Sequence, residues 1–318
     1  MHWKDCRCRP SIRNCTMIVE LIHNPASGTY NEHRLDALSR AFQACGAQVR
    51  LGRTEKDGQF EILPDCDLVC VSGGDGALQL VVASMVRSEI LKPLCIFPSG
   101  TVNLVAKELG YSSEPEIFAR EIMAGYRDAE QSRLVAPLVT VDGQPFVACL
   151  SAGPDGQAVA RHNPALKKRF GGAAYAWSLI KLLGDWPDFR FSLALRMRDG
   201  TTDHLNCSAF YVIKARHYAG NWVMAPAAEL ASRYFHVILL TRARRRDFLR
   251  FIVQIARGLD PETLDFVQCL PAFQLTMIAK DEISRSASFQ ADGDMLETQP
   301  HEVKMTDRAI TYCLPLSQ

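Results

Sequence analysis

The chain has 318 residues, of which 47% are hydrophobic and 22% charged, so it can form one large or two ordinary domains with a substantial core. Its formal net charge of +1 argues against nucleic-acid binding driven by bulk charge. No apolar run reaches the roughly 18 residues that span a bilayer, so we expect any membrane contact to be peripheral.

Cysteine usage and the first residues favour a reduced, cytoplasmic protein. The sequence has eleven cysteines, and several lie inside apolar runs, where a free cysteine behaves as a small hydrophobe. It has no pair of CxxC motifs, so we do not expect a zinc site. Residues 1–16 are basic and lack the apolar core of a signal peptide. We expect them to be a disordered extension, or to precede a natural start at Met17.

The first part of the chain alternates between strand-like and helix-like patterns. Such alternation predicts a doubly wound parallel sheet with helices on its faces, the α/β arrangement common in nucleotide-binding domains. Strand patterns cover 17–22, 47–51, 67–72 and 94–97, and helical patterns cover 31–45, 78–85 and 103–109, with a weak one around 57–63.

Polar turns follow three of these strands, at Asn24–Gly28, Gly73–Ala77 and Pro98–Asn103. Because parallel strands end at the same edge of a sheet, we expect the three turns to line up there. The glycines let the backbone approach an anion at a helix N-terminus, but Asp75 would repel phosphate unless a cation lay between them. We interpret the set as a nucleotide–Mg²⁺ site. The alternative is a tight turn in which Asp75 makes local hydrogen bonds.

After Gly125 the pattern becomes rich in strands. Asp142-Gly143, between apolar runs at 129–140 and 144–150, is typical of a hairpin turn. The alternating runs that follow predict a β-rich second domain from about 130 to 295. Strand patterns cover 189–197, 202–214, 222–224, 234–240, 273–278 and 288–291; helical patterns lie within 157–184 and over 247–257; residues 151–156 form a polar turn.

Four motifs in a fixed order resemble the diacylglycerol kinase catalytic-domain family: Asn24–Gly28, Gly73–Gly76, Pro98–Asn103 and Asp292–Asp294. This family includes bacterial diacylglycerol kinases, sphingosine kinases and ceramide kinases, and the stretch Gly100–Gly110 resembles the bacterial members in particular. The resemblance implies an α/β nucleotide-binding domain, similar to those of NAD kinases and phosphofructokinases, followed by a β-sandwich-like domain. The domains expected are 17–130 for the nucleotide and 131–295 for the lipid substrate, with 296–318 returning to the first domain.

The resemblance also implies roles for individual residues. Asp75 would carry the Mg²⁺–phosphate chemistry. Asp294 falls where the family has its acidic general base, and Asp292 is the alternative acceptor. Since Asp294 is one methylene shorter than the usual Glu, the substrate hydroxyl must come closer or a water must mediate. The residues expected around ATP are Asn24, Pro25, Ala26, Ser27, Gly28, Thr54, Gly73, Gly74, Asp75, Gly76, Ala77, Thr101 and Asn103.

The sequence departs from the family pattern at two places. Ala77 stands where the family usually has Thr or a similar side chain, so one hydroxyl contact to phosphate is lost, worth about 1 kcal/mol. Residues 229–237 lack the acidic motif that holds a structural Mg²⁺ in many bacterial diacylglycerol kinases. Ser232, Arg233 and His236 are poor Mg²⁺ ligands, so we do not carry that metal site over.

These observations predict an ATP-dependent kinase that phosphorylates a hydroxyl of a membrane lipid, with Asp294 as general base. Diacylglycerol, monoacylglycerol and ceramide or another sphingoid lipid all remain open as substrates. The alternatives are an NAD-kinase-type enzyme acting on a soluble substrate, which shares the Gly-Gly-Asp-Gly loop, and a non-catalytic nucleotide- or lipid-binding protein. The sequence leaves open whether the protein forms a homodimer.

We expect the protein to associate peripherally with the inner face of the membrane, because basic residues gather in two places. They could meet anionic lipid head groups, each worth about 1 kcal/mol near such a surface, although a solvated helix face is the alternative. Aromatic residues around 170–189 could line a lipid entrance or could be core. The basic residues are Lys167, Lys168, Arg169, Arg242, Arg244, Arg245, Arg246 and Arg250, and the aromatic ones are Phe170, Tyr175, Trp177, Trp186 and Phe189.

Overall fold

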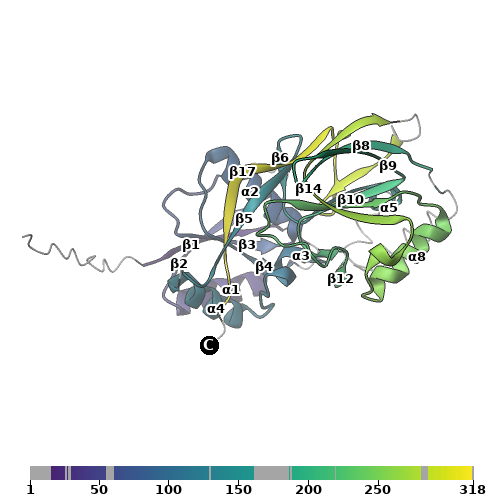
Figure 1. The fold of residues 1–318 in the computed structure, drawn as a ribbon. Coiled ribbons are helices and arrows are strands. Elements are labelled where there is room, and N and C mark those ends of the chain that lie inside the picture. The colour runs from purple at the N-terminus through teal and green to yellow at the C-terminus, as the bar shows by residue number, and fades with distance from the viewer. Residues whose placement is uncertain are drawn as a thin grey trace, which may run out of the picture.

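One mixed β-sheet, curved and continuous, organises the molecule (Figure 1). The computed structural model describes residues 16–25, 27, 30–54, 61–128, 130–160, 186, 188–218, 220–280 and 286–316. Within these residues the sheet has 15 strands, and a separate pair of short strands lies beside it. Its first part is parallel and carries helices on both faces, and its second part is antiparallel.

The parallel part has the strand order β4-β3-β1-β2, with helices α1 and α4 on one face and α2 on the other (Figure 1). β3 is buried along its whole length, as expected for a central strand covered on both faces. The predicted doubly wound arrangement is therefore confirmed. The elements are β1 (Ile18–His23), α1 (Glu32–Ala44), β2 (Gln48–Arg53), β3 (Leu68–Gly73), α2 (Asp75–Ser88), β4 (Leu94–Pro98), α3 (Leu104–Glu108) and α4 (Pro115–Arg127).

Two differences from the sequence patterns fall in this part. Residues 61–63, the described portion of the weak pattern at 57–63, form no helix. Helix α4 was not predicted, although its buried Phe118, Ile122 and Met123 follow helical spacing. Gly125 lies inside this helix, where glycine normally signals a break.

The antiparallel part folds around its own cluster of buried side chains, in which the rings of Phe191, Phe210 and Phe289 contact one another. The predicted Asp142-Gly143 turn is confirmed, since φ is 47° and 84° at these residues. The strands are β5 (Arg133–Val141), β6 (Gln144–Phe146), β7 (Cys149–Ala152), β8 (Phe191–Met197), β9 (Thr202–Cys207), β10 (Ala209–Ile213), β11 (His217–Tyr218), β12 (Trp222–Val223), β13 (Phe235–Leu240), β14 (Val267–Lys280), β15 (Phe289–Ala291) and β16 (Asp294–Met295); the helices are α5 (Pro154–Ala160), α8 (Arg245–Ala256) and the 3-10 helix η1 (Pro261–Thr263).

Three sequence patterns in this part need correction. The single strand expected over 202–214 is two strands, β9 and β10, which have different neighbours in the sheet. β14 begins before Pro271, and a register shift between Ala272 and Gln274 shows that it continues through an irregularity. The polar turn expected at 151–156 is the end of β7 and the start of α5. The pattern within 157–184 is helical to Ala160, and residues 161–184 lie outside those described.

The last strand, β17 (Glu302–Cys313), joins the two parts of the sheet. It runs antiparallel to β14 and β5, and at Tyr312 it pairs in parallel with Leu94 of β4. Hydrogen bonds then tie the following residues to the first part, from Leu314 N to Ser132 O (2.9 Å) and from Leu316 N to Glu121 O (3.2 Å).

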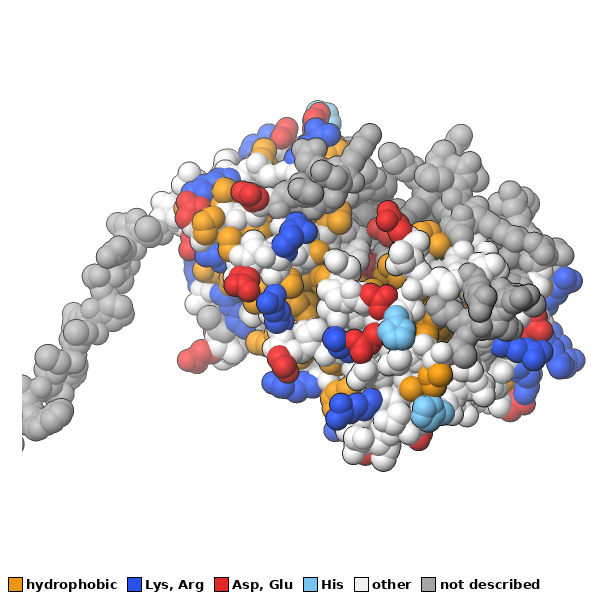
Figure 2. All heavy atoms as spheres, turned by 90° about the horizontal axis from the view of Figure 1, so that it is seen from above, with side chains coloured by type: hydrophobic (Ala, Val, Ile, Leu, Met, Phe, Trp, Pro, Cys, Tyr) orange, Lys and Arg blue, Asp and Glu red, His pale blue; other side chains and the backbone are white. Residues whose placement is uncertain are grey.

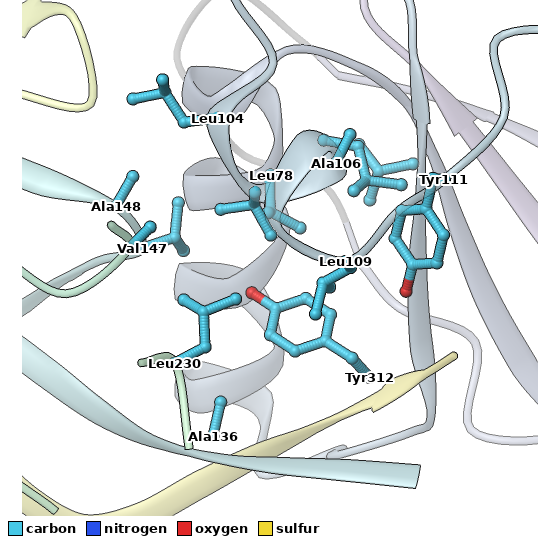
Figure 3. Packing of buried hydrophobic residues seen from close by; sticks show 14 of the residues in the cluster. Leu78, Leu104, Ala106, Leu109, Tyr111, Ala136, Val147, Ala148, Leu230 and Tyr312 are labelled. Carbon is cyan, nitrogen blue, oxygen red and sulfur yellow. The ribbon is translucent and has the colours of Figure 1, made fainter. Parts of the chain in front are cut away.

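The larger hydrophobic core consequently crosses from one part of the sheet to the other. In Figure 3, Leu78 of α2 and Leu109 after α3 lie close to Tyr312 of β17 and to Val147 and Leu230 of the second part. These side chains are 0–8% exposed, so the surface between the two parts is dry and tightly packed.

The residues that follow β17 pass close to Gly125 of α4, and a substitution there tests this packing. A β-carbon there would lie 2.1 Å from the carbonyl oxygen of Leu314. Alanine favours an ordinary helix over glycine by about 1 kcal/mol, yet we expect Gly125→Ala to lower the free energy of unfolding by ~1–3 kcal/mol through overpacking. Chemical denaturation measures the effect. In a control chain ending at Cys313 the same substitution should cost less, because only the 3.1 Å approach to the β-carbon of Ser132 remains, and a gain in stability in the full chain would contradict the prediction.

Candidate active site

The carboxyl ends of β1, β2, β3 and β4 meet at one edge of the sheet, and the predicted polar turns lie there. Backbone hydrogen bonds link them: Asn24 N donates to Ser72 O (3.3 Å), Thr54 N to His23 O (3.0 Å) and Ser99 N to Gly73 O (3.1 Å). The structure thus brings the three turns and Thr54 together. Of the residues expected around ATP, Ala26 and Gly28 lie outside the described residues.

Two of these turns touch backbone to backbone at Gly74 and Gly100. A β-carbon on Gly100 would lie 2.4 Å from the α-carbon of Gly74, and one on Gly74 would lie 3.1 Å from the α-carbon of Gly100. Asn103 fixes the second turn, since its Oδ1 accepts from Gly100 N (2.9 Å) and its Nδ2 donates to Gly100 O (2.8 Å). A side chain at position 100 would therefore force the two turns apart, and one at position 74 would be tightly packed. Thr101, in the same turn, is exposed.

Asp75 connects the same two turns through its side chain. It is 7% exposed, and its Oδ2 and Oδ1 accept from Leu104 N (2.8 Å) and Val105 N (3.0 Å) at the start of α3. Burial raises the pKa of the Asp75 carboxyl, and the two backbone N–H groups act in the opposite direction. These bonds reach backbone groups 29 and 30 residues further along the chain, so they are not the local hydrogen bonds of the alternative interpretation. Binding of Mg²⁺–phosphate by Asp75 stays a prediction.

The N-terminus of α2 opens onto this edge. Gly74 is its N-cap with extended backbone and no side-chain cap, so the first N–H groups of the helix have no side-chain acceptor at the cap. Such a terminus attracts anions. Ala77 is 4% exposed, and its β-carbon lies beside Gly73. The hydroxyl of Ser27 lies on the same side, 3.6 Å from the position that a β-carbon on Gly73 would take. Ser27 thus offers a hydroxyl close to the one that Ala77 lacks.

The motif Asp292-Gly293-Asp294 forms the turn between β15 and β16, and its two aspartates face opposite environments. The carboxylate of Asp292 is buried and accepts from the backbone N–H groups of Val147 (2.7 Å), Ala148 (2.8 Å) and Cys149 (3.1 Å). Burial raises the pKa of Asp292 to about 7, against the effect of these three donors. Asp292 thus holds the backbone between β6 and β7 to the turn after β15.

Asp294 is exposed and lies against the glycine loop of the first part. A β-carbon on Gly76 would be 2.5 Å from Oδ2 of Asp294. Thus a carboxylate more than 200 residues away along the chain contacts the first turn of α2. Gly76 leaves the space that this carboxylate occupies.

A buried polar network behind this turn was not foreseen from the sequence. Gln290 Nε2 donates to Ser151 Oγ (2.8 Å), and the Ser151 and Tyr218 hydroxyls both donate to the buried carboxylate of Asp155. Gln290 Oε1 accepts from Gly293 N (2.8 Å), which ties the network to the residue before Asp294. The available signal was a polar residue within each of two apolar strands, Ser151 in β7 and Gln290 in β15.

Around residues 229–237, the buried side chain of Lys214 donates a hydrogen bond to the carbonyl oxygen of Ser232. Burial lowers the pKa of Lys214 to about 8, and burial together with Lys214 lowers the pKa of His236. The amine of Lys214 is therefore held against residues 229–237.

Across the described residues, no group of three or more His, Cys, Asp or Glu side chains could hold a metal ion. Mg²⁺ carried by nucleotide phosphates needs less, usually one or two carboxylates with water and phosphate oxygens completing the shell. Asp75, which begins α2, is such a carboxylate, and the exposed carboxylate of Asp294 lies against the same helical turn.

The aromatic candidates for a lipid entrance are core where they can be described. Phe189 is 2% exposed, and Trp186 packs against Phe248 with the ring planes tilted by 59° and donates to Ala243 O (2.7 Å). Phe170, Tyr175 and Trp177, like Lys167, Lys168 and Arg169, lie outside the described residues. None of the helices that the structure describes is long and apolar enough to cross a bilayer.

Comparison with known proteins agrees with this architecture. Residues 19–131 match the diacylglycerol kinase catalytic domain, and residues 148–314 match the YegS C-terminal NAD kinase beta sandwich-like domain. The chain belongs to the diacylglycerol kinase catalytic-domain family of lipid kinases. The family resemblance and the expected pairing of an α/β domain with a β-sandwich-like domain are confirmed.

Individual relatives show how far the likeness extends. The chain is 24% identical over 250 residues to a diacylglycerol kinase of Bacillus subtilis (strain 168), covering 76% of this chain and 79% of the relative. It is 31% identical over 176 residues to a probable lipid kinase YegS-like of Stenotrophomonas maltophilia (strain K279a), covering 52% and 55%. A solved structure of a diacylglycerol kinase from Bacillus anthracis str. Sterne has a TM-score of 0.66 at 17% identity, with 94% of this chain and 97% of that chain covered, and shows the shared fold.

The hydrogen bonds that Asp75 makes and its predicted binding of Mg²⁺–phosphate can be separated by substitution. Asp75→Ala leaves two buried N–H groups without an acceptor, so we expect it to lower the free energy of unfolding by ~2–4 kcal/mol and to abolish turnover. Asp75→Asn keeps one acceptor oxygen and the size of the side chain but loses the charge. We expect a folded Asn variant, judged by thermal denaturation, that still loses turnover. Near-normal activity in that variant would show that the residue acts only in hydrogen bonding.

Proposed function

We propose that this protein is an ATP-dependent kinase that transfers phosphate to a hydroxyl of a membrane lipid, either diacylglycerol or ceramide or another sphingoid lipid. One observation carries the proposal: Asp294, from the second part of the sheet, contacts Gly76 at the first turn of α2. An exposed carboxylate thereby lies next to an anion-binding helix N-terminus. Family membership supports the kinase chemistry, and the relatives named diacylglycerol kinase and lipid kinase support a lipid acceptor.

Phosphoryl transfer depends mainly on positioning and on neutralising charge. The turns at Gly73–Ala77 and Pro98–Asn103 present backbone N–H groups at the edge where the phosphates of ATP would lie, held in place by the Gly74–Gly100 contact. Asp75 is the residue that would hold Mg²⁺, which supplies positive charge against the phosphate oxygens when bound.

Asp294 is the general base in this proposal. It would accept the proton of the lipid hydroxyl as that oxygen attacks the terminal phosphate in line. Asp292 is the weaker candidate, because its oxygens accept three backbone N–H groups and its side chain is buried. The Gln290 contact to Gly293 N supports the turn and so helps to fix where the Asp294 carboxylate lies.

The deciding experiment is transfer of label from γ-labelled ATP in the presence of Mg²⁺. Diacylglycerol, monoacylglycerol, ceramide and sphingosine are offered in mixed micelles, and NAD is offered as the soluble alternative, which the family relationship does not favour. We expect one lipid class to be labelled. Labelling of NAD would identify a soluble-substrate kinase, and tight ATP binding without transfer to any acceptor would favour a non-catalytic binding protein.

The contact between Gly76 and Asp294 predicts a non-additive pair of substitutions. Removing a general base costs about 10²–10⁴-fold, so we expect Asp294→Ala to lower kcat by that order while ATP binding changes little. Gly76→Ala would displace the same carboxylate, because the new methyl would lie 2.5 Å from Oδ2, and should lower kcat at least tenfold.

In the double variant we expect no further loss beyond Asp294→Ala alone, since the displaced group is already absent. The matched control is Asp203→Ala, an exposed carboxylate on β9, which should leave kcat unchanged. Additive losses in the double variant would show that Gly76→Ala acts on the glycine loop and not on Asp294.

A further inference from the structure

Helix α8 is anchored to the protein by one face only. Asp247, Phe248, Phe251 and Ile255 are buried on that face, and Phe251 packs against Tyr211 with the ring centroids 5.7 Å apart. The packing that holds the helix in place is thus complete without its other face.

The opposite face of α8 carries an apolar stripe. Leu249 is 55% exposed and Val253, one turn later, is 45% exposed, and the exposed Ala256 continues the stripe. At 3.6 residues per turn, Arg245 lies along one side of this stripe, and Arg246 and Arg257 lie along the other. All three arginines are exposed. Single exposed aliphatic side chains are common, but a stripe with arginines on both sides is not an ordinary solvated face.

The arginines that cluster in the sequence between positions 242 and 250 differ in their surroundings in the structure. Arg242 turns toward the protein: its Nη2 lies 2.6 Å from Oδ2 of Asp265, and its guanidinium stacks over Phe266 at 4.9 Å. Arg250 stacks on the same ring at 5.5 Å. Arg245, Arg246 and Arg257 are exposed beside the stripe, and Arg246, whose Nε lies 3.9 Å from Oδ1 of Asp247, keeps a side chain that is 76% exposed.

This chemistry fits the surface of an anionic bilayer. Aliphatic side chains enter the boundary between head groups and acyl chains, while arginines beside them reach lipid phosphates. Each basic residue close to an anionic surface strengthens partitioning by roughly fivefold. α8 lies at the end of the molecule away from α1 and α4, and Figure 2 shows Lys and Arg side chains gathered at this end.

We propose that the exposed face of α8, formed by Arg245, Arg246, Leu249, Val253, Ala256 and Arg257, docks the protein on anionic lipid bilayers. The proposal rests on the proposed function, because an enzyme whose acceptor lies in a bilayer must first reach that surface. The stripe enters the interface, and the flanking arginines set the preference for negative charge.

Vesicle co-sedimentation of the full chain tests the assignment. The vesicles are pure phosphatidylcholine, or equal parts phosphatidylcholine and phosphatidylglycerol, at low salt. We expect binding to the anionic vesicles, at least a tenfold loss in Leu249→Ser/Val253→Ser, and a similar loss in Arg245→Gln/Arg246→Gln/Arg257→Gln. The matched control is Ile117→Ser/Arg120→Gln on α4, which carries one exposed apolar and one exposed basic residue and should bind as the parent does.

Equal binding by the parent and the α8 variants would overturn the proposal, as would equal binding of the parent to both kinds of vesicle. Self-association that the serine variant abolishes would also overturn it, by showing that the face is covered by a second copy. Activity on a short-chain lipid dissolved as monomers tests the chemistry separately. The α8 variants should keep that activity, so its absence in the parent would count against the proposed function and not against the docking face.

Discussion

The hydrogen bonds from the Asp75 carboxylate to the start of α3 are the constraint on which the rest of the site depends. Asp75 opens α2, and Leu104 and Val105 open α3, so one side chain fixes the ends of two helices relative to each other. With the two helix starts joined, the turns that precede them are pressed together at Gly74 and Gly100. Contacts within the protein thus fix the edge of the sheet, which reduces the conformational cost of binding a ligand there.

The second constraint is that the site is made by two distant portions of the chain. Asp294 reaches Gly76 because its turn is fixed from behind, by Asp292 on the backbone of Val147 to Cys149 and by Gln290 on Gly293. A fully bonded polar network inside a core specifies one arrangement, since any displacement leaves buried groups without partners. The turn that carries Asp294 is thus fixed by hydrogen bonds to Asp292 and Gln290, most of them buried.

The sequence was informative wherever a local pattern determines the structure. The strand-turn-helix order at Val69–Met85 and the Asp142-Gly143 hairpin depend on neighbouring residues and could be predicted. The features that the sequence did not predict depend on contacts between residues far apart in the chain. Gly125 is tolerated in α4 because Leu314 passes over it, and Pro271 lies within β14 through an irregularity. The roles of Ser151 and Gln290 appear only once β7 and β15 are paired, since neither residue has a polar neighbour in sequence that signals its partner.

The course of β17 makes the two parts of this protein depend on each other in folding. A chain divided at the boundary between the nucleotide-binding and β-rich segments would leave β4, an almost wholly buried apolar strand, as an unprotected sheet edge. Such an edge pairs readily with other chains. The closing strand at the C-terminal end of the chain therefore also protects the first part from association with other chains.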